Sequence, residues 1–226
     1  MAIPKDLQES IEQGQVIPFV GAGVSIAVKR KGLQKSLFPS WKQLLENACK
    51  ELDANDKSVF ANSIKSELHL PEPDLLLAAQ RARQGLKGGL WAKFLKSQFD
   101  HSKDDVEDES LKLAKLVWEL GSNLIIPTNY DRVLRWSCGD SANLAEWDIE
   151  APAEQADALR NGAKKPTIWH LHGQIDNASD LILTPDGYKF LYPEKEGIEG
   201  VYKAALETLR SFLVSHSFVY RIQFTR

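Results

Sequence analysis

The stretch that decides the fold is VIPFVGAGVS, residues 16–25. Its apolar run predicts a buried strand, its two glycines predict a tight turn, and Ser25 stands where a helix begins. Such a corner directs backbone N–H groups at a point where the helix dipole favours negative charge, as in many phosphate sites. A side chain at Gly21 or Gly23 would keep a pyrophosphate from the backbone, and glycine also accepts the positive φ that a sharp turn can require.

Two features depart from the common dinucleotide-binding fingerprint. The third glycine or alanine of that fingerprint is replaced by Ile26, and no acidic residue marks the end of a second strand. Pro18 is also unusual inside a central strand, because it has no N–H to donate. On these residues alone, a phosphate site and a strand-to-helix corner without a ligand stay equally open.

The composition is that of an ordinary globular protein. The chain has 226 residues, of which 43% are hydrophobic and 26% are charged, with a net charge of −3 and a pI near 6.0. These values favour neither a nucleic-acid partner nor a membrane surface, and no apolar run approaches the roughly 20 residues of a membrane span. The N-terminus lacks the apolar core of a signal peptide, so we expect a cytoplasmic protein. Two cysteines, Cys49 and Cys138, cannot form a four-cysteine zinc site.

Strand and helix patterns alternate along the chain. Strands are predicted over 16–20, 123–127, 167–171, 181–184 and 217–220, and helices over 6–13, 24–28, 40–52, 59–68, 74–84, 90–99, 110–120 and 199–214, with a helical turn after 188. This alternation predicts an α/β fold with a Rossmann-like, doubly wound, mostly parallel sheet. The helical stretch 55–100 predicts a helical module within a single domain over 1–226. The loop 29–39 is expected over the site, and 137–165 is weakly patterned.

Polar residues follow two of the predicted strands. Thr128-Asn129-Tyr130-Asp131 ends one, and His170-Leu171-His172-Gly173 ends another. Ligands of open α/β sheets bind at the carboxyl ends of strands, so these groups are candidates for a site. Local Asx turns explain Asn129 and Asp131 equally well. His170 and His172 are expected on one side of their strand, but no third metal ligand is evident.

The ordered set of these motifs resembles the sirtuin-like domains of prokaryotic defence proteins, over roughly residues 10–220. The set comprises Gly21-Ala22-Gly23-Val24-Ser25, Pro39-Ser40-Trp41, Thr128-Asn129-Tyr130-Asp131, Leu171-His172-Gly173, and Leu183-Thr184 with Tyr188. The resemblance implies a Rossmann-type NAD-binding core with a helical module, and catalysis by Asn129 and His172. Because this chain cannot carry the four-cysteine zinc module of protein deacylases, it is more similar to the branch that destroys NAD, without zinc. Related domains continue after 218–220 with a glycine-containing strand, so the ending at 221–226 is expected to be altered or truncated.

The chemistry of each group suggests its role in breaking the nicotinamide glycosidic bond. The backbone of Gly21, Ala22, Gly23 and Ser25 is expected to hold the pyrophosphate, with the Ser25 hydroxyl as a further donor, and Thr128 and Tyr188 are the other candidates for binding NAD. Asn129 is suited to orient a water or a ribose hydroxyl, and Asp131 to bind the ribose or fix the loop. His172 is suited to accept a proton. Tyr188 is equally explained as a core residue.

Three functions remain after this reasoning. The first is an NAD glycohydrolase that releases nicotinamide and ADP-ribose and depletes NAD during phage infection. The second is a catalytically weak module that senses NAD or ADP-ribose, and the third is an NAD-dependent protein deacylase. Hydrolysis and cyclisation stay open, because both pass through the same cleaved intermediate. The expected partners are NAD and either a second copy or an effector or sensor domain, with no direct nucleic-acid contact and no membrane.

Overall fold

A parallel sheet of four strands lies at the centre of the described chain. The computed structural model describes residues 4–14, 16–150, 152–162 and 164–191. Its strands are β1 (Phe19–Val20), β2 (Leu124–Pro127), β3 (Ala145–Trp147) and β4 (Thr167–Trp169), in the order β1-β2-β4-β3. All three pairings are parallel, with Phe19 opposite Ile126, Leu124 opposite Thr167, and Trp147 opposite Trp169. The carboxyl ends of the four strands therefore share one edge.

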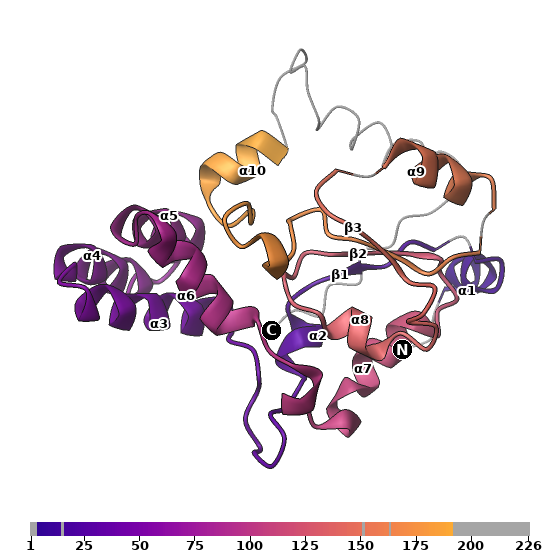
Figure 1. Cartoon of the computed structure of the whole chain (residues 1–226), viewed down its shortest axis with the longest axis horizontal. Coiled ribbons are helices and arrows are strands. Elements are labelled where there is room, and N and C mark those ends of the chain that lie inside the picture. Colours follow the sequence, from indigo (N-terminus) through magenta and orange to yellow (C-terminus); the bar gives the residue numbers. More distant parts are fainter. Residues whose placement is uncertain (1–3, 15, 151, 163, 192–226) are drawn as a thin grey trace.

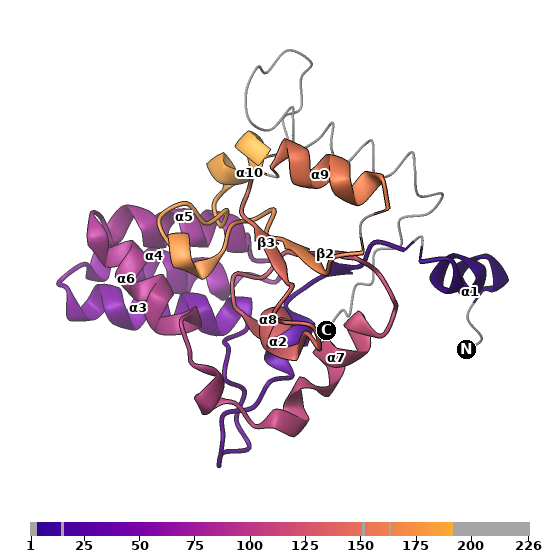
Figure 2. The same ribbon diagram turned by 45° about the vertical axis from the view of Figure 1, so that its right-hand side comes forward.

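Helices cover both faces of the sheet, as Figures 1 and 2 show. On one side lie α9 (Ala153–Arg160) and α10 (Pro185–Leu191), and on the other α2 (Gly23–Ile26), α7 (Lys112–Trp118) and α8 (Val133–Ser137). Two separate apolar clusters match these layers: Ile125 and Ile168 belong to one, Leu124 and Trp169 to the other. Alternate residues of a strand face opposite sides, which explains the division. The prediction of a Rossmann-like, doubly wound α/β fold is confirmed.

The remaining helices form a bundle at one end of the molecule and short connecting turns (Figure 1). The bundle contains α3 (Trp41–Ala54), α4 (Ser58–Leu68), α5 (Leu75–Gly85) and α6 (Gly89–Phe99); α1 (Lys5–Glu12) and the 3-10 turns η1 (Lys103–Asp105), η2 (Asp108–Leu111) and η3 (Ile175–Asn177) lie outside it. The Ser40 hydroxyl accepts from Gln43 N, so α3 begins with the expected capping box. Because α3 packs on α4 and α5, the bundle spans 41–99, whereas the sequence predicted a module over 55–100. None of the described helices is long and apolar enough to cross a bilayer.

Two predicted stretches differ in the structure. The segment 181–184 forms no strand: Ile182 N donates to His172 O (3.0 Å), and Ile182 O accepts from the Tyr130 hydroxyl (2.7 Å). Leu181, Ile182 and Leu183 are buried because this segment packs against the turn after β4, so the prediction of a strand is wrong. The weakly patterned stretch 137–165 contains β3 and α9, which the sequence analysis missed. The predicted helix 199–214 and strand 217–220 lie outside the described residues.

The two irregular features near β1 have local explanations. Pro18 uses only its carbonyl, which accepts from Ile126 N (2.9 Å), and β1 lies at the edge of the sheet that the described residues form. The missing N–H of proline is therefore tolerated. The loop 29–39 is tied to the segment around η1 and η2, because Lys29 O accepts from Glu107 N (2.9 Å) and Lys31 N donates to Asp105 O (2.7 Å).

Candidate active site

The glycine corner leads from the end of β1 directly into α2. Val24 N donates to Gly21 O (3.3 Å), which closes the turn. Neither Gly21 nor Gly23 is among the described residues with positive φ. The turn therefore does not need the positive φ that glycine accepts, which the sequence had suggested as one reason for these glycines. A Cβ built on Gly21 would meet, among the described residues, the Thr128 hydroxyl at 3.9 Å, an ordinary contact. The corner therefore leaves space where a side chain would project.

Asn129 joins the polar end of β2 to this corner. Its Nδ2 donates to Gly21 O (3.1 Å) and to Ser25 Oγ (2.6 Å). The two segments meet because β1 and β2 pair in parallel, and Thr128 N extends the pairing by donating to Val20 O (2.8 Å). An Asx turn does not account for Asn129, since its amide binds a different segment of the chain.

Asp131 does form the local turn. Its Oδ1 accepts from Val133 N (3.0 Å) at the start of α8, and only 7% of the residue is exposed. The carboxylate also accepts a hydrogen bond from Ser25. Burial raises the pKa of Asp131, whereas the hydrogen bonds from Ser25 and Val133 and the charge of His170 lower it. Ser25 thus accepts from Asn129 and donates to Asp131, which links the three side chains.

His172 lies in the turn that follows β4. It is 4% exposed, and burial lowers its pKa from 6.5 to about 4, an effect that a hydrogen bond to the backbone of Thr128 partly opposes. Its ring meets the ring of Tyr188 edge-on, with centroids 5.3 Å apart. Tyr188 is presented by α10, whose first turn is capped by the Thr184 hydroxyl through Gly187 N (3.5 Å). His172 is therefore a dry, uncharged imidazole at neutral pH, close to the end of β2.

Gly173 is required by the conformation of this turn. Its φ is +85°, and a Cβ there would lie 3.0 Å from Leu181 Cδ2. Gly173 N donates to His170 O (2.8 Å), which closes the turn around His172. The glycine after the histidine thus lets the chain reverse beneath Leu181 and bring His172 to the carboxyl edge of the sheet.

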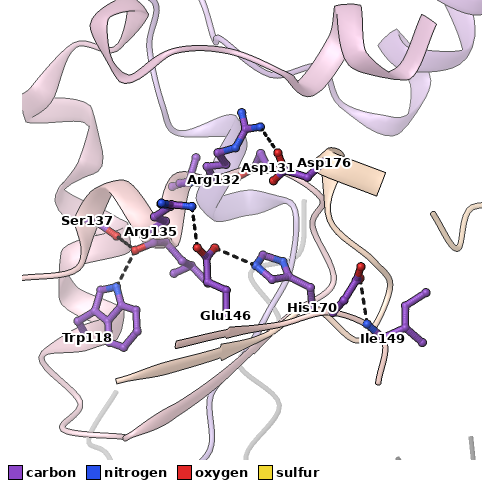
Figure 3. Close-up of polar contacts among 12 residues, drawn as sticks. Trp118, Asp131, Arg132, Arg135, Ser137, Glu146, Ile149, His170 and Asp176 are labelled. Atoms are coloured by element: carbon purple, nitrogen blue, oxygen red, sulfur yellow. Dashed lines mark hydrogen bonds and ion pairs between the residues drawn. The ribbon is translucent and has the colours of Figure 1, made fainter. Parts of the chain in front are cut away.

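His170 contacts other elements than His172 does, because the regular alternation of β4 ends at Trp169. Its Nε2 lies 3.4 Å from Glu146 Oε1 of β3, and Glu146 Oε2 accepts from Arg135 Nη1 of α8 (2.9 Å), as Figure 3 shows. The alternation of strand residues predicted both histidines on one side of the strand, and it did not indicate Glu146 or Arg135. Both lie in or beside the stretch in which β3 was not recognised.

A cavity of about 620 Å³ adjoins these residues. It is lined by Arg83, Asp148, Ile149, Glu150, Ser179, Asp180, Leu181, Ile182, Asp186 and Gly187. Gly21, Asn129 and His172 do not line it, but Ile182 connects it to His172 through its backbone hydrogen bond. Its volume suits a small ligand, although its four carboxylates and one guanidinium make it a poor place for a pyrophosphate. No group of three or more His, Cys, Asp or Glu among the described residues is placed to hold a metal ion.

The parallel sheet, with helices on both faces and polar groups at the carboxyl ends of its strands, defines an α/β domain of the Rossmann type. In a comparison with known proteins, the family model described as "SIR2-like domain" matches residues 123–218. The chain is 24% identical over 220 residues to "NAD(+) hydrolase ThsA" of Cytobacillus dafuensis, covering 95% of this chain and 37% of that protein. It is 25% identical over 218 residues to "NAD(+) hydrolase ThsA" of Enterococcus faecium, covering 96% of this chain and 38% of that protein. The chain is thus similar to SIR2-like proteins, and it spans a little over a third of the length of each of these two relatives.

Proposed function

We propose that this chain is an NAD glycohydrolase, which uses water to cleave NAD into nicotinamide and ADP-ribose. The observation that carries the proposal is the pair of hydrogen bonds from Asn129 Nδ2 to Gly21 O and Ser25 Oγ. They bring a neutral amide to the glycine corner that suits a pyrophosphate. The names of the two relatives support the same activity.

The reaction does not require the protein to form a covalent bond with the substrate. The bond between C1′ of the ribose and the nicotinamide nitrogen breaks, its electron pair neutralises the pyridinium, and the oxygen of water bonds to C1′. One proton of that water must leave, and His172 accepts it before it passes to solvent. Asn129 orients the water or a ribose hydroxyl, and Asp131 supports the loop from which Asn129 projects.

The corner residues hold the dinucleotide. We assign the pyrophosphate to the backbone N–H groups of Gly21, Ala22 and Gly23, all of which are partly exposed. Ser25 is 4% exposed and donates to Asp131, so its contribution is to orient Asn129 rather than to contact phosphate. Thr128, whose backbone forms a hydrogen bond with His172, and Tyr188, whose ring contacts His172 edge-on, complete the proposed NAD site.

We further propose that the domain acts in defence, by depleting NAD during phage infection. This part rests on the motifs shared with sirtuin-like domains of defence proteins. It is tested separately, by measuring cellular NAD and phage yield in infected cells that express either the wild-type chain or the Asn129→Ala variant. Equal NAD and equal phage yield in the two strains would remove the defence role and leave the enzymatic proposal in place.

The enzymatic proposal is tested by incubating the purified chain with NAD and separating the products by chromatography. We expect nicotinamide together with ADP-ribose; cyclic ADP-ribose in its place would identify a cyclase. Asn129→Ala and His172→Ala are each expected to lower turnover by about a hundredfold or more. The matched controls are Asn143→Ala and His69→Ala, because both side chains are exposed and lie in other parts of the fold.

The outcome also separates catalysis from sensing. Binding of NAD in a one-to-one ratio without nicotinamide release would replace the enzyme by a sensor module. Full turnover by a folded Asn129→Ala variant would remove the assigned site while keeping the activity. Unfolding curves of each variant show whether a loss of turnover reflects chemistry or loss of the fold.

A further inference from the structure

Arg132 joins two elements of the fold that are far apart in the sequence. Its Nη1 donates to Asp100 Oδ1 (2.6 Å) at the end of α6, and its Nη2 donates to Asp176 Oδ1 (2.6 Å) in η3. Figure 3 shows the second of these contacts. A planar guanidinium can hold two nitrogens on two separate carboxylates in a fixed geometry. Arg132 therefore ties the helical bundle and the turn after β4 to the start of α8.

The segment 128–132, which Arg132 ends, lies between the glycine corner and the turn that carries His172. On the corner side, Asn129 Nδ2 donates to the backbone of the corner (3.1 Å). On the turn side, Ile175 N donates to Tyr130 O (2.8 Å), three residues after His172. The contacts between the segment and the turn therefore set the placement of Asn129 relative to His172.

The two ion pairs of Arg132 add little to the stability of the fold by themselves. The side chain of Arg132 is 23% exposed, and those of Asp100 and Asp176 are 39% and 51% exposed. Ion pairs this open to solvent contribute little to the free energy of unfolding. What Arg132 does supply is the positive charge between two carboxylates. Without it, Asp100 and Asp176 would repel each other, and the end of α6 would move away from the turn.

We propose that Arg132 is a positioning residue, which keeps Asn129 and His172 in their working arrangement by holding the turn after β4 against the segment 128–132. Its contact with Asp100 fixes the guanidinium from the side of the bundle, so the position of α6 also affects the site. The inference rests on the proposed function, because the relative placement of Asn129 and His172 affects turnover only if both act on NAD.

The test is a double-mutant cycle on the purified full chain, with NAD as substrate. Arg132→Met removes the positive charge and keeps most of the length of the side chain, and Asp176→Asn removes one of the two carboxylates. We expect Arg132→Met alone to lower kcat about tenfold, with KM for NAD within about twofold. In the presence of Asp176→Asn, Arg132→Met should lower kcat less than about threefold, because the ion pair is already absent and the two carboxylates no longer repel.

Three further measurements separate positioning from a general loss of structure. The Kd for ADP-ribose should stay within about twofold in Arg132→Met, since the corner that is proposed to hold it is unchanged. Arg132→Lys keeps the charge and should lower kcat less than about threefold. Arg81→Met is the matched control, because Arg81 pairs with Glu67 (3.4 Å) inside the bundle, and it should leave kcat and KM unchanged. If Arg132→Met does not fold, Arg132→Gln replaces it in the cycle.

Equal losses of kcat from Arg132→Met with and without Asp176→Asn would overturn the proposal, since residues that act independently have additive effects. A Kd for ADP-ribose that rises in step with the loss of kcat would also overturn it. If the wild-type chain does not cleave NAD, the proposed function fails on its own, and hydrogen exchange decides the inference. Arg132→Met should then speed amide exchange in residues 170–182 at least about threefold and leave residues 16–26 unchanged. Equal exchange in variant and wild type over 170–182 would overturn the role of Arg132.

Discussion

The burial of His172 predicts that this single residue makes the fold sensitive to mild acid. Its pKa falls from 6.5 to about 4 in the folded chain, chiefly because burial disfavours the charged ring. Between these two pH values the unfolded chain binds a proton that the folded chain does not. The stability that is fully present above pH 6.5 is therefore lost as the pH falls, until the folded ring also titrates near pH 4.

The size of this loss of stability follows from the difference between the pKa of His172 in the unfolded chain and its pKa in the folded chain. At about 1.36 kcal/mol for each pH unit, the free energy of unfolding should fall by about 3 kcal/mol between pH 7 and pH 4. This is a large part of the about 5–15 kcal/mol that stabilises a typical domain. His172→Gln cannot bind the proton, so its stability should change less over the same range.

Urea unfolding followed by tryptophan fluorescence at several pH values measures this contribution. The quantity of interest is the wild-type free energy minus that of His172→Gln, because other titrating groups cancel in the difference. One of them is His101, whose pKa burial also lowers. His69→Gln serves as the exposed control and should follow the wild type. Parallel curves for wild type and His172→Gln between pH 6.5 and 4.5 would refute the reasoning.

Three further substitutions separate folding from function. Gly21→Ala should change the free energy of unfolding by less than about 1 kcal/mol, since its Cβ meets Thr128 at an ordinary 3.9 Å, yet raise the Kd for ADP-ribose in calorimetry at least about tenfold. Gly85→Ala is the contrasting glycine: its Cβ would lie 3.0 Å from Phe60 Cγ, so unfolding should show a loss of about 1–3 kcal/mol. Asp131→Asn removes a charge that burial disfavours, so at pH 7 the unfolding free energy should stay equal or rise while turnover falls about tenfold. Unchanged affinity of Gly21→Ala for ADP-ribose would contradict the first expectation. Unchanged stability of Gly85→Ala would contradict the second, and unchanged turnover of Asp131→Asn the third.

The elements that the sequence predicted correctly are those whose signals are local. The helix after Ser40 has a capping box and a long apolar stripe, and β2 is a short run in which every residue is apolar and buried. By contrast, β3 has only three residues, and Trp147 alone among them is buried. Its hydrophobic pattern therefore does not mark it as a strand; its parallel pairing with β4 does. The apolar run 181–184 gave the opposite error, because burial under a turn and burial in a sheet select the same residue types.

The same distinction applies to the candidate site. The meeting of residues 128–131 with the glycine corner followed from the rule that ligands bind at the carboxyl ends of parallel strands. The sequence did not show whether Asn129 or Asp131 would form a local turn. Either side chain can accept a hydrogen bond from the backbone N–H two residues further on. The contact of Glu146 with His170 depends on the pairing of β3 and β4, which no local signal encodes.

The environments of Asp131 and His172 suit the charge of the proposed substrate. Burial raises the pKa of the carboxyl and lowers that of the imidazole, so both groups are shifted toward their uncharged forms. On the proposed reaction, nicotinamide leaves as a neutral molecule from a cation, and positive charge develops on the ribose in the transition state. An imidazolium beside that charge would raise the barrier, whereas a dry neutral His172 does not repel it. An imidazole with a pKa near 4 is a weak base, but departure of nicotinamide needs no strong base. Burial of His172 therefore lowers the stability of the fold in acid for the same reason that it suits this chemistry.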